Sequence, residues 1–326
     1  MKPFAYVKAA NEQQALAALG RERGRVLPLA GGMDLVSLLK DRIATPDRLV
    51  TVKGLDSTIA PTPDGGLRVG AAVRLVDLHG HATVTGQYRA LAEAAAEVGT
   101  PQIRNLGTVG GNLMQRPRCW YFRNEEFPCL KKGGARCFSV DGENQFHAIL
   151  GGGPCYIVHP SSLAVPLVAF GAKVRINGPR GEREVLAEEF FELPERNLYG
   201  ETMLRPDELL THVILPPAQA MKSATYEVRF RSSHDWPIAF ASVALGLQGT
   251  TVSDARVVLG AVAPIPWRSP EAEAALKGQA VSEATAMKAA EAALAGASPM
   301  TQNAYKVRVA RTAVKRAILH AAGVTA

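Results

Sequence analysis

Apolar and polar positions in the first part of the chain switch between helical and extended spacing. The pattern is helical over residues 12–19 (EQQALAAL), a short apolar run over 25–32 (RVLPLAGG), helical again over 33–42 (MDLVSLLKDR) and strand-like over 48–52 (RLVTV). Strands that alternate with helices are typical of βαβ packing. We therefore expect this part of the chain to fold around a mixed sheet.

A second group of elements follows this first lobe. It begins with a strand-like run at residues 67–73 (LRVGAAV), continues with a helical pattern at 90–98 (ALAEAAAEV), and ends in a largely apolar stretch at 156–176. We expect residues 1–217 to form one domain with two lobes, at about 1–56 and 57–217. An irregular segment at about 115–156 interrupts the second lobe.

The composition changes after the two prolines at 216 and 217, which mark the best domain boundary. Strand-like runs then occupy residues 224–231, 238–248 and 254–263, and helical patterns occupy 270–296 and 303–323. Strands followed by helices predict an α+β domain in which helices cover an antiparallel sheet. We place this second domain at residues 222–326.

Composition and charge exclude several classes of protein. The chain has 326 residues, of which 47% are hydrophobic and 21% charged, as in ordinary globular proteins. The net charge is +7, but Lys and Arg are dispersed, so a basic stripe of the kind that nucleic-acid-binding proteins carry is missing. No apolar run reaches the roughly 18 residues of a membrane span, and the polar N-terminus lacks an export signal. We therefore predict a cytoplasmic chain without a membrane span.

Three glycine- or serine-containing turns have the composition of phosphate-binding sites. They lie at residues 27–35 (LPLAGGMDL), 105–113 (NLGTVGGNL) and 159–172 (HPSSLAVPLVAFGA). Adjacent glycines leave room for a ligand, and a following helix contributes the positive end of its dipole. Each turn has a simpler interpretation as a tight turn or a helix cap. None matches the usual dinucleotide or nucleoside-triphosphate fingerprint.

All four cysteines lie within one short segment, at positions 119, 129, 137 and 155. Closely spaced cysteine pairs, which mark structural zinc or a redox disulfide, are absent, and nothing in the sequence indicates secretion. An iron–sulfur cluster tolerates such long spacings. Four unligated thiols remain the alternative on spacing alone, and zinc comes third.

Several motifs in fixed order give the chain a family resemblance. "LAGGMDL", "QIRNLGTVGGNL", "RCWYFRN", "CYIVHPSSLA" and "ARVVLGAVAPIPWR" resemble the FAD-binding medium subunit of the xanthine dehydrogenase family of molybdenum hydroxylases. The resemblance extends over essentially the whole chain. It is strongest to the branch with an iron–sulfur insertion, which includes 4-hydroxybenzoyl-CoA reductase and a bacterial aldehyde oxidoreductase.

This resemblance implies a fold and two cofactors. The fold would be a two-lobed FAD-binding domain of the vanillyl-alcohol-oxidase type, followed by the α+β domain. In the insertion-bearing branch, four cysteines between the second glycine turn and the "HPSDLA" helix hold one 4Fe-4S cluster. Cys119, Cys129, Cys137 and Cys155 lie between the same two landmarks.

The resemblance also implies an FAD site. Its residues would be Leu27, Pro28, Leu29, Ala30, Gly31, Gly32, Met33, Asp34 and Leu35 in the first turn, Thr108, Gly110, Gly111 and Asn112 in the second, then Ser162 and Arg229. We expect backbone amides of the two glycine turns to bind the pyrophosphate. Two positions depart from the family pattern: Met33 replaces a Thr, and Ser162 replaces an Asp whose charge would accept a stronger hydrogen bond.

The implied function is electron transfer within a larger enzyme. We find no acid–base constellation and assign no catalytic residue, and we interpret His147 and His159 as structural. The expected partners are a large subunit with the molybdenum cofactor, a small 2Fe-2S subunit and an electron acceptor. The expected substrate, bound on another chain, is an aldehyde.

Other interpretations remain open at this stage. The partners could instead form an aryl-CoA reductase or an N-heterocycle hydroxylase, and an exported partner could carry this chain to the periplasm. A stand-alone flavin oxidoreductase ranks lower, because no sequence feature positions a substrate. The alternative from another class is a metal-stabilised binding module without flavin.

Overall fold

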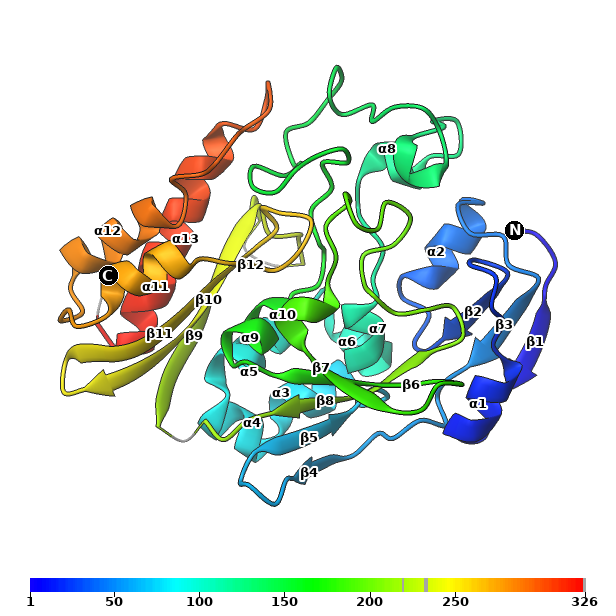
Figure 1. The fold of residues 1–326 in the computed structure, drawn as a ribbon, viewed down its shortest axis with the longest axis horizontal. Helices are drawn as coiled ribbons and strands as arrows, with labels where there is room; N and C mark the ends of the chain where they lie inside the picture. The colour runs from blue at the N-terminus through cyan, green and yellow to red at the C-terminus, as the bar shows by residue number, and fades with distance from the viewer. Residues whose placement is uncertain (219, 232–233, 325–326) are drawn as a thin grey trace.

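The computed structural model describes residues 1–218, 220–231 and 234–324, which form three sheets with helices packed around them (Figure 1). The three sheets follow one another along the long axis of the molecule, and the two termini lie at opposite ends. In the parts of the chain that are described, no helix is long and apolar enough to cross a membrane.

The first sheet consists of three parallel strands in the order β1-β3-β2. Strands β1 (Ala5–Lys8), β2 (Val26–Leu29) and β3 (Arg48–Thr51) are joined by helices α1 (Glu12–Ala18) and α2 (Leu35–Lys40). Central strand β3 buries Leu49 and Val50. The strand–helix alternation that the sequence predicts for residues 12–52 is confirmed.

The second sheet is separate and antiparallel, with the strand order β4-β5-β8-β6-β7. Its strands are β4 (Ile59–Pro61), β5 (Leu67–Gly70), β6 (Lys173–Asn177), β7 (Arg183–Leu186) and β8 (Leu209–Leu215). The sequence predicted a mixed sheet for the first lobe, and the sheet there is purely parallel. The antiparallel second sheet was not predicted. Local patterns could not reveal this, because β8 pairs with β5 across a long stretch of intervening chain.

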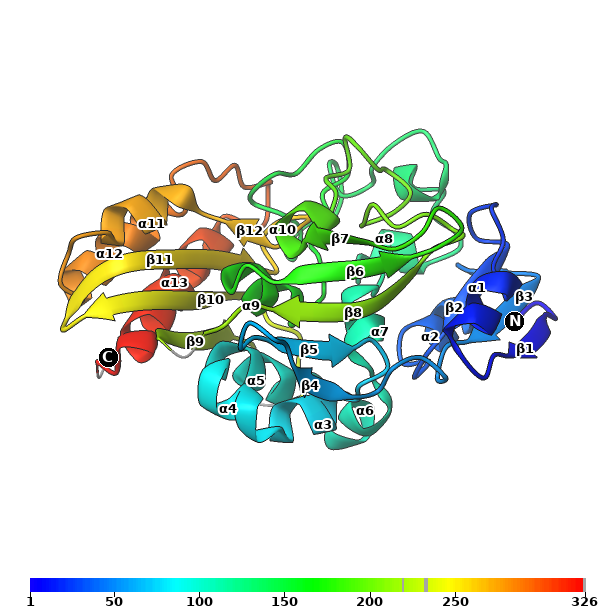
Figure 2. The same ribbon diagram turned by 60° about the horizontal axis from the view of Figure 1, so that its bottom comes forward.

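Short helices pack around the second sheet. These are α3 (Leu75–Gly80), α4 (Ala82–Gln87), α5 (Arg89–Ala96), α6 (Pro101–Leu106), α7 (Val109–Leu113), α9 (Ala164–Ala169) and α10 (Ala187–Phe190). Figure 2 shows α3, α4 and α5 gathered beside β4 and β5. Their buried residues share one hydrophobic core with β5, β6 and β8, and this core continues to Phe240 and Val258 of the third sheet.

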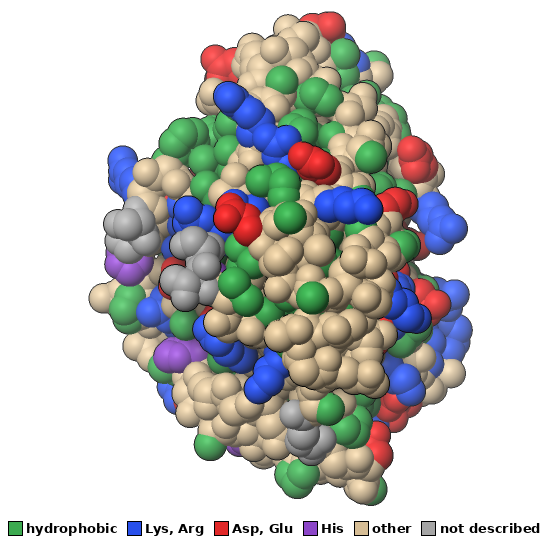
Figure 3. All heavy atoms as spheres, turned by 90° about the vertical axis from the view of Figure 1, so that its left-hand side faces the viewer, with side chains coloured by type: hydrophobic (Ala, Val, Ile, Leu, Met, Phe, Trp, Pro, Cys, Tyr) green, Lys and Arg blue, Asp and Glu red, His purple; other side chains and the backbone are tan. Residues whose placement is uncertain are grey.

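The third sheet is antiparallel, in the order β12-β11-β10-β9, and helices cover it as predicted. It contains β9 (Met221–Val228), β10 (Ala239–Gln248), β11 (Thr251–Gly260) and β12 (Trp267–Arg268), with α11 (Pro270–Leu276), α12 (Glu283–Ala292) and α13 (Tyr305–Ala322) packed on it. Residue 219, in the predicted boundary segment, lies outside the described residues. On the face in Figure 3, Lys and Arg side chains are interspersed with Asp and Glu.

The cysteine segment crosses from the second lobe to the third sheet with little regular structure. It contains helix α8 (Trp120–Arg123) and the 3-10 turn η1 (Leu130–Lys132). The amides of Ile149 and Leu150 donate to the carbonyl oxygen of Val262, and the amide of His159 donates to that of Ala263. The segment is therefore attached to the chain that follows β11.

Phe240 packs tightly against Gly260, shortly before Val262 and Ala263, to which this segment is hydrogen-bonded. The two residues lie opposite each other in β10 and β11, and a Cβ atom on Gly260 would lie 2.1–2.6 Å from the Phe240 ring. We predict that Gly260→Ala lowers the free energy of unfolding by about 1–3 kcal/mol, as in other overpacked cores. Urea unfolding followed by circular dichroism measures this.

Gly86→Ala is the matched control, because Gly86 lies in α4 with no atom within 4 Å of an added Cβ. Alanine favours helix there by up to about 1 kcal/mol, so the control protein should be at least as stable as the wild type. Wild-type stability of Gly260→Ala would contradict the packing described for the β10–β11 pair.

Candidate functional site

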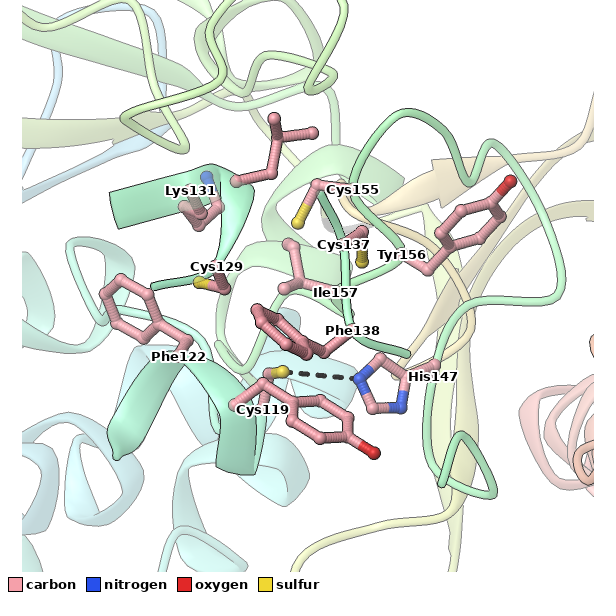
Figure 4. Close-up of a pocket in the computed structure, with 12 residues that line it drawn as sticks. Cys119, Phe122, Cys129, Lys131, Cys137, Phe138, His147, Cys155, Tyr156 and Ile157 are labelled. Atoms are coloured by element: carbon pink, nitrogen blue, oxygen red, sulfur yellow. Dashed lines mark hydrogen bonds between the residues drawn. The ribbon is translucent and has the colours of Figure 1, made fainter. Parts of the chain in front are cut away.

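The structure brings all four cysteines to one cavity (Figure 4). Cys119, Cys129, Cys137 and Cys155 line it together with aromatic and aliphatic side chains, and none of the four forms a disulfide. Cys129 and Cys155 are buried, whereas Cys119 and Cys137 are partly accessible. Thiols far apart in the sequence thus face a common space.

Local turns orient these thiols. Cys119 directly precedes α8, and Cys129 precedes η1. The chain reverses tightly after Cys129, with the amides of Lys132 and Gly134 both donating to its carbonyl oxygen. Gly133 has a φ of 93°, and a Cβ on Gly134 would lie only 1.6 Å from the carbonyl oxygen of Pro128. The two glycines of "KKGGAR" are therefore required by this turn.

Hydrogen bonds to the sulfurs differ among the cysteines. A hydrogen bond joins the Cys137 and Cys155 sulfurs, and it lowers the pKa of Cys137 to about 5 and raises the pKa of Cys155. The Ser139 hydroxyl lies 3.1 Å from the Cys137 sulfur. Burial raises the pKa of Cys119 to about 11, although backbone N–H groups of Phe122 and Tyr121 oppose this. N–H and O–H donors aimed at sulfur are the environment that a thiolate ligand needs.

The four cysteines can be compared with the ligand geometry of a single metal ion. Tetrahedral zinc holds each sulfur at about 2.3 Å, so the sulfurs of its cysteine ligands must lie close to one another. Among the residues that the structure describes, no three His, Cys, Asp or Glu side chains are close enough to hold one metal ion. Four free thiols around a common cavity are the type and number of ligands that an iron–sulfur cluster takes.

Two buried lysines lie beside this cavity. Lys131 lines it, and its ammonium, on a side chain only 1% exposed, is 2.9 Å from the Glu201 carboxylate. Lys306 of α13 donates to the carbonyl oxygens of Phe146, His147 and Ala261 at 2.7–3.0 Å. Sequence reasoning missed both, because only the packed fold shows which of the many lysines are buried.

The two histidines interpreted as structural are both buried. Nε2 of His147 lies 3.3 Å from the Cys119 sulfur, and burial, together with the Lys306 charge, lowers the pKa of His147 to about 4. Burial also lowers the pKa of His159 to about 3, and Nδ1 of His159 accepts from the amide of Ser161. Both imidazoles are therefore neutral at physiological pH, and only His147 lines the cysteine cavity among the described residues.

The first two glycine turns lie against each other. A Cβ on Gly31 would lie 2.0 Å from the carbonyl oxygen of Leu106, so only glycine fits there. A Cβ on Gly111 would meet only the Thr108 hydroxyl at 3.0 Å and Ala30 at 3.7 Å. Gly31 is thus required by the fold, whereas Gly111 keeps an open side.

The two turns differ in the donors that they leave free. In the second turn, the amides of Gly111 and Asn112 donate to the hydroxyl and the carbonyl oxygen of Thr108, which caps the short helix α7. The Gly110 amide donates to the carbonyl oxygen of Ala71. The free donors that we expected there are therefore not present. In the first turn, the amides of Gly31, Gly32, Met33 and Asp34 form no hydrogen bond within the described residues. Residues 31–34 thus carry the backbone N–H groups of the first turn that have no acceptor within the described residues.

The remaining predicted FAD contacts lie in different surroundings. Ser161, rather than Ser162, caps α9 and donates to Asn112 at 2.7 Å, and the Ser162 hydroxyl has no partner within the described chain. Met33 is exposed. Arg229 is already paired, with Glu97 at 2.6 Å and with Glu227. Ser162 is therefore available to a ligand, whereas a flavin contact by Arg229 would compete with two carboxylates.

One carboxylate connects the first turn to the cysteine segment. Asp34 accepts from the amide of Arg116 at 2.9 Å, and its Oδ1 lies 2.7 Å from guanidinium nitrogens of both Arg118 and Arg123. These three arginines flank Cys119 in the sequence. Three arginines within "RPRCWYFR" indicate that an acidic side chain lies nearby, and the sequence analysis did not use this signal.

The chain matches two known protein families. Residues 2–218 match the FAD binding domain in molybdopterin dehydrogenase, and residues 224–321 match the CO dehydrogenase flavoprotein C-terminal domain. Among curated proteins, the FAD-binding subunit of the Escherichia coli aldehyde oxidoreductase is 37% identical over 280 residues, covering 85% of this chain and 86% of that protein. The glyceraldehyde dehydrogenase medium chain of Sulfolobus acidocaldarius is 26% identical, covering 86% of this chain and 83% of that protein.

Solved structures agree with these matches over the full length. A chain of carbon monoxide dehydrogenase from Hydrogenophaga pseudoflava superposes with a TM-score of 0.77 at 28% identity, covering 99% of this chain and 98% of that chain. A chain of quinoline 2-oxidoreductase from Pseudomonas putida 86 has a TM-score of 0.76 at 26% identity, covering 99% of both chains.

The Asp34 contacts generate a prediction about stability. Asp34→Asn leaves two guanidinium groups without their carboxylate, and the Asp34 and Arg123 side chains are only 15% and 13% exposed. We expect a loss of about 2–3 kcal/mol in the free energy of unfolding, somewhat below that of a fully buried pair. We also expect faster trypsin cleavage within residues 116–137.

Asp77→Asn provides the control, because Asp77 pairs with Arg74 on the exposed surface of α3. Such pairs contribute little, so this variant should unfold and be cleaved as the wild type is. If the two variants behaved alike, Asp34 would not anchor the cysteine segment.

Proposed function

Because the chain belongs to the FAD-binding medium subunits of the xanthine dehydrogenase and carbon monoxide dehydrogenase family, we propose that it is the electron-transfer subunit of a molybdenum-dependent aldehyde dehydrogenase. In this role it holds FAD and one 4Fe-4S cluster and delivers electrons from partner subunits to an external acceptor. The observation that carries the cluster assignment is the gathering of four unpaired cysteines around one cavity beside the first glycine turn.

The first turn and its surroundings suit the pyrophosphate of FAD. The unpaired amides of residues 31–34 would donate to phosphate oxygens, and Gly111 would allow the ligand to approach closely. The Ser162 hydroxyl would take the place of the family's carboxylate with a weaker, uncharged contact. FAD supplies the redox chemistry when bound, and the chain's own residues orient it and exclude water.

The four cysteines suit the cluster in number, burial and hydrogen bonding. Cys119, Cys129, Cys137 and Cys155 would each give one thiolate, and the segment around them supplies N–H and O–H donors to sulfur. Lys131 would offset part of the negative charge that four thiolates bring into a buried site. The cluster supplies one-electron transfer when present.

The proposed partners complete the enzyme. A large subunit would carry the molybdenum cofactor and bind the substrate, and a small subunit would carry 2Fe-2S clusters. The names of the aldehyde oxidoreductase and glyceraldehyde dehydrogenase relatives favour an aldehyde substrate. The quinoline 2-oxidoreductase match keeps N-heterocycle hydroxylation as the second candidate. We propose the two matched segments, 2–218 and 224–321, as the two domains.

Purification of the native complex tests this assignment. Affinity purification through this chain should bring down a molybdenum-containing subunit, and the complex should reduce a dye when an aldehyde is added. If a heterocycle but no aldehyde supported dye reduction, the proposed substrate class would change from aldehydes to N-heterocycles. A chain that stays alone in the cell would contradict the subunit role.

Gly111 provides a test of FAD binding that leaves the fold intact. We predict that Gly111→Leu retains less than about half of the wild-type flavin, because the new side chain extends from the open side of the second turn into the proposed ligand space. Flavin absorbance per protein measures this. Gly86→Leu on the exposed helix α4 is the matched control and should retain full flavin. Full retention in Gly111→Leu would remove that turn from the site.

Metal analysis tests the cluster directly. Protein purified without oxygen should contain about four iron and four sulfide per chain, as the cluster type requires. Cys129→Ser should lose most of both, because Cys129 is buried and contributes one of four ligands. Ser37→Ala, which removes a hydroxyl outside the cavity, should retain them. Stoichiometric zinc, or wild-type iron in Cys129→Ser, would contradict the assignment.

A further inference from the structure

His147 has a contact that distinguishes it from the other side chains around the cysteine cavity. Its Nε2 points at the sulfur of Cys119 at 3.3 Å, as the dashed line in Figure 4 shows. Within the described part of the chain, it is the one imidazole that lines the cavity. The sequence analysis interpreted this residue as structural, and neither the proposed FAD site nor the proposed cluster ligands use it.

The direction of this hydrogen bond follows from the chemistry of sulfur. A cysteine that ligates a metal does so as a thiolate, which can only accept. Nε2 of His147 must then carry the hydrogen. Nδ1 of the same ring is buried and has no hydrogen-bond partner among the described residues. A hydrogen on Nε2 therefore leaves no buried N–H group unpaired, and Nδ1 remains a buried acceptor without a partner among the described residues.

The ring is held rigidly in this orientation. The carbonyl oxygen of His147 accepts from Asn303 Nδ2 at 3.1 Å and from Lys306 Nζ at 3.0 Å, and its amide donates to Asn144 at 2.9 Å. The ring packs edge-on against Trp120 at 5.9 Å. The segment before α13 and the helix itself thus hold the backbone of His147, and among the described residues the one polar contact of its ring is the sulfur.

The sulfurs of Cys137 and Cys155 are hydrogen-bonded to groups of other kinds. Cys137 has the Ser139 hydroxyl, and Cys155 has the backbone amide of Ile157. Cys119 has two backbone amides and, in addition, an imidazole from a distant part of the fold. Hydrogen bonds to sulfur are among the main determinants of iron–sulfur reduction potentials, because they stabilise the added negative charge of the reduced state.

We propose that His147 is a positioning residue that donates its Nε2–H to the Cys119 sulfur and thereby raises the reduction potential of the cluster held by the four cysteines. This inference rests on the proposed function. One electron enters the cluster on reduction, no covalent bond changes, and the hydrogen remains on Nε2. The added charge is delocalised partly over Cys119, where the imidazole stabilises it.

Two substitutions at this position separate the hydrogen bond from packing. His147→Phe keeps an aromatic ring against Trp120 but cannot donate, whereas His147→Gln places an amide N–H near the position of Nε2. In the complex, anaerobic titration monitored by the EPR signal of the reduced cluster measures the midpoint potential. We expect His147→Phe to reduce the equilibrium constant for cluster reduction about tenfold, a downward shift of about 59 mV. His147→Gln should restore most of it, and the flavin potential should not change.

Phe138→Leu is the matched control, because Phe138 lines the same cavity but has no polar atom. An equal shift in Phe138→Leu would overturn the proposal by showing that packing alone sets the potential. Iron-loaded His147→Phe with the wild-type potential would overturn it while leaving the proposed function intact. Loss of iron from both His147 variants would also overturn it, since His147 would then be a structural support. Wild-type protein without iron would instead contradict the proposed function.

Discussion

The buried ammonium of Lys306 is the interaction on which the position of the cysteine segment depends. It donates to carbonyl oxygens of Phe146 and His147 in that segment and of Ala261 beyond β11. Burial lowers the pKa of Lys306 to about 7, so the three carbonyl dipoles have to replace the water that the charge has lost. A single charge on α13 thereby joins the C-terminal helices, the third sheet and the cavity wall.

The opposite side of the segment is held by the same kind of contact. Asp34 binds Arg118 and Arg123, and Glu201 binds Lys131 and Arg116. The apolar cluster beneath the segment is small, with Leu38, Phe122 and Cys129 as its buried members. Ion pairs, rather than a large apolar core, therefore attach this side of the segment to the rest of the chain. Asp34 also belongs to the first glycine turn, so the cysteine segment and the proposed FAD site share this carboxylate.

Local sequence patterns predicted some parts of the structure well. The strand–helix alternation of residues 12–52 and the strands and helices after residue 221 were correct, because each element has a clear period of its own. The third serine-containing turn leads into a helix, as its interpretation as a helix cap implied, and α9 ends at Ala169 with Gly171 at a φ of 66°. The second sheet was not predicted, because its central pairing of β5 with β8 depends on contacts far apart in the sequence.

The sequence by itself determined the residue types that the proposed site needs: four thiols in one segment, two glycine-rich turns, and motifs in the order of one family. Only the tertiary structure decided which of these groups remain free to act. The amides of Gly111 and Asn112 donate to Thr108 in the cap of α7 and that of Gly110 donates to Ala71, while those of residues 31–34 form no hydrogen bond within the described residues. His147 contacts Cys119 only because residues on and before α13 hold its backbone there. The Thr108 cap is a local hydrogen-bond pattern, whereas the bond from Gly110 to Ala71 and the contacts that position His147 join distant segments, and no local pattern encodes those.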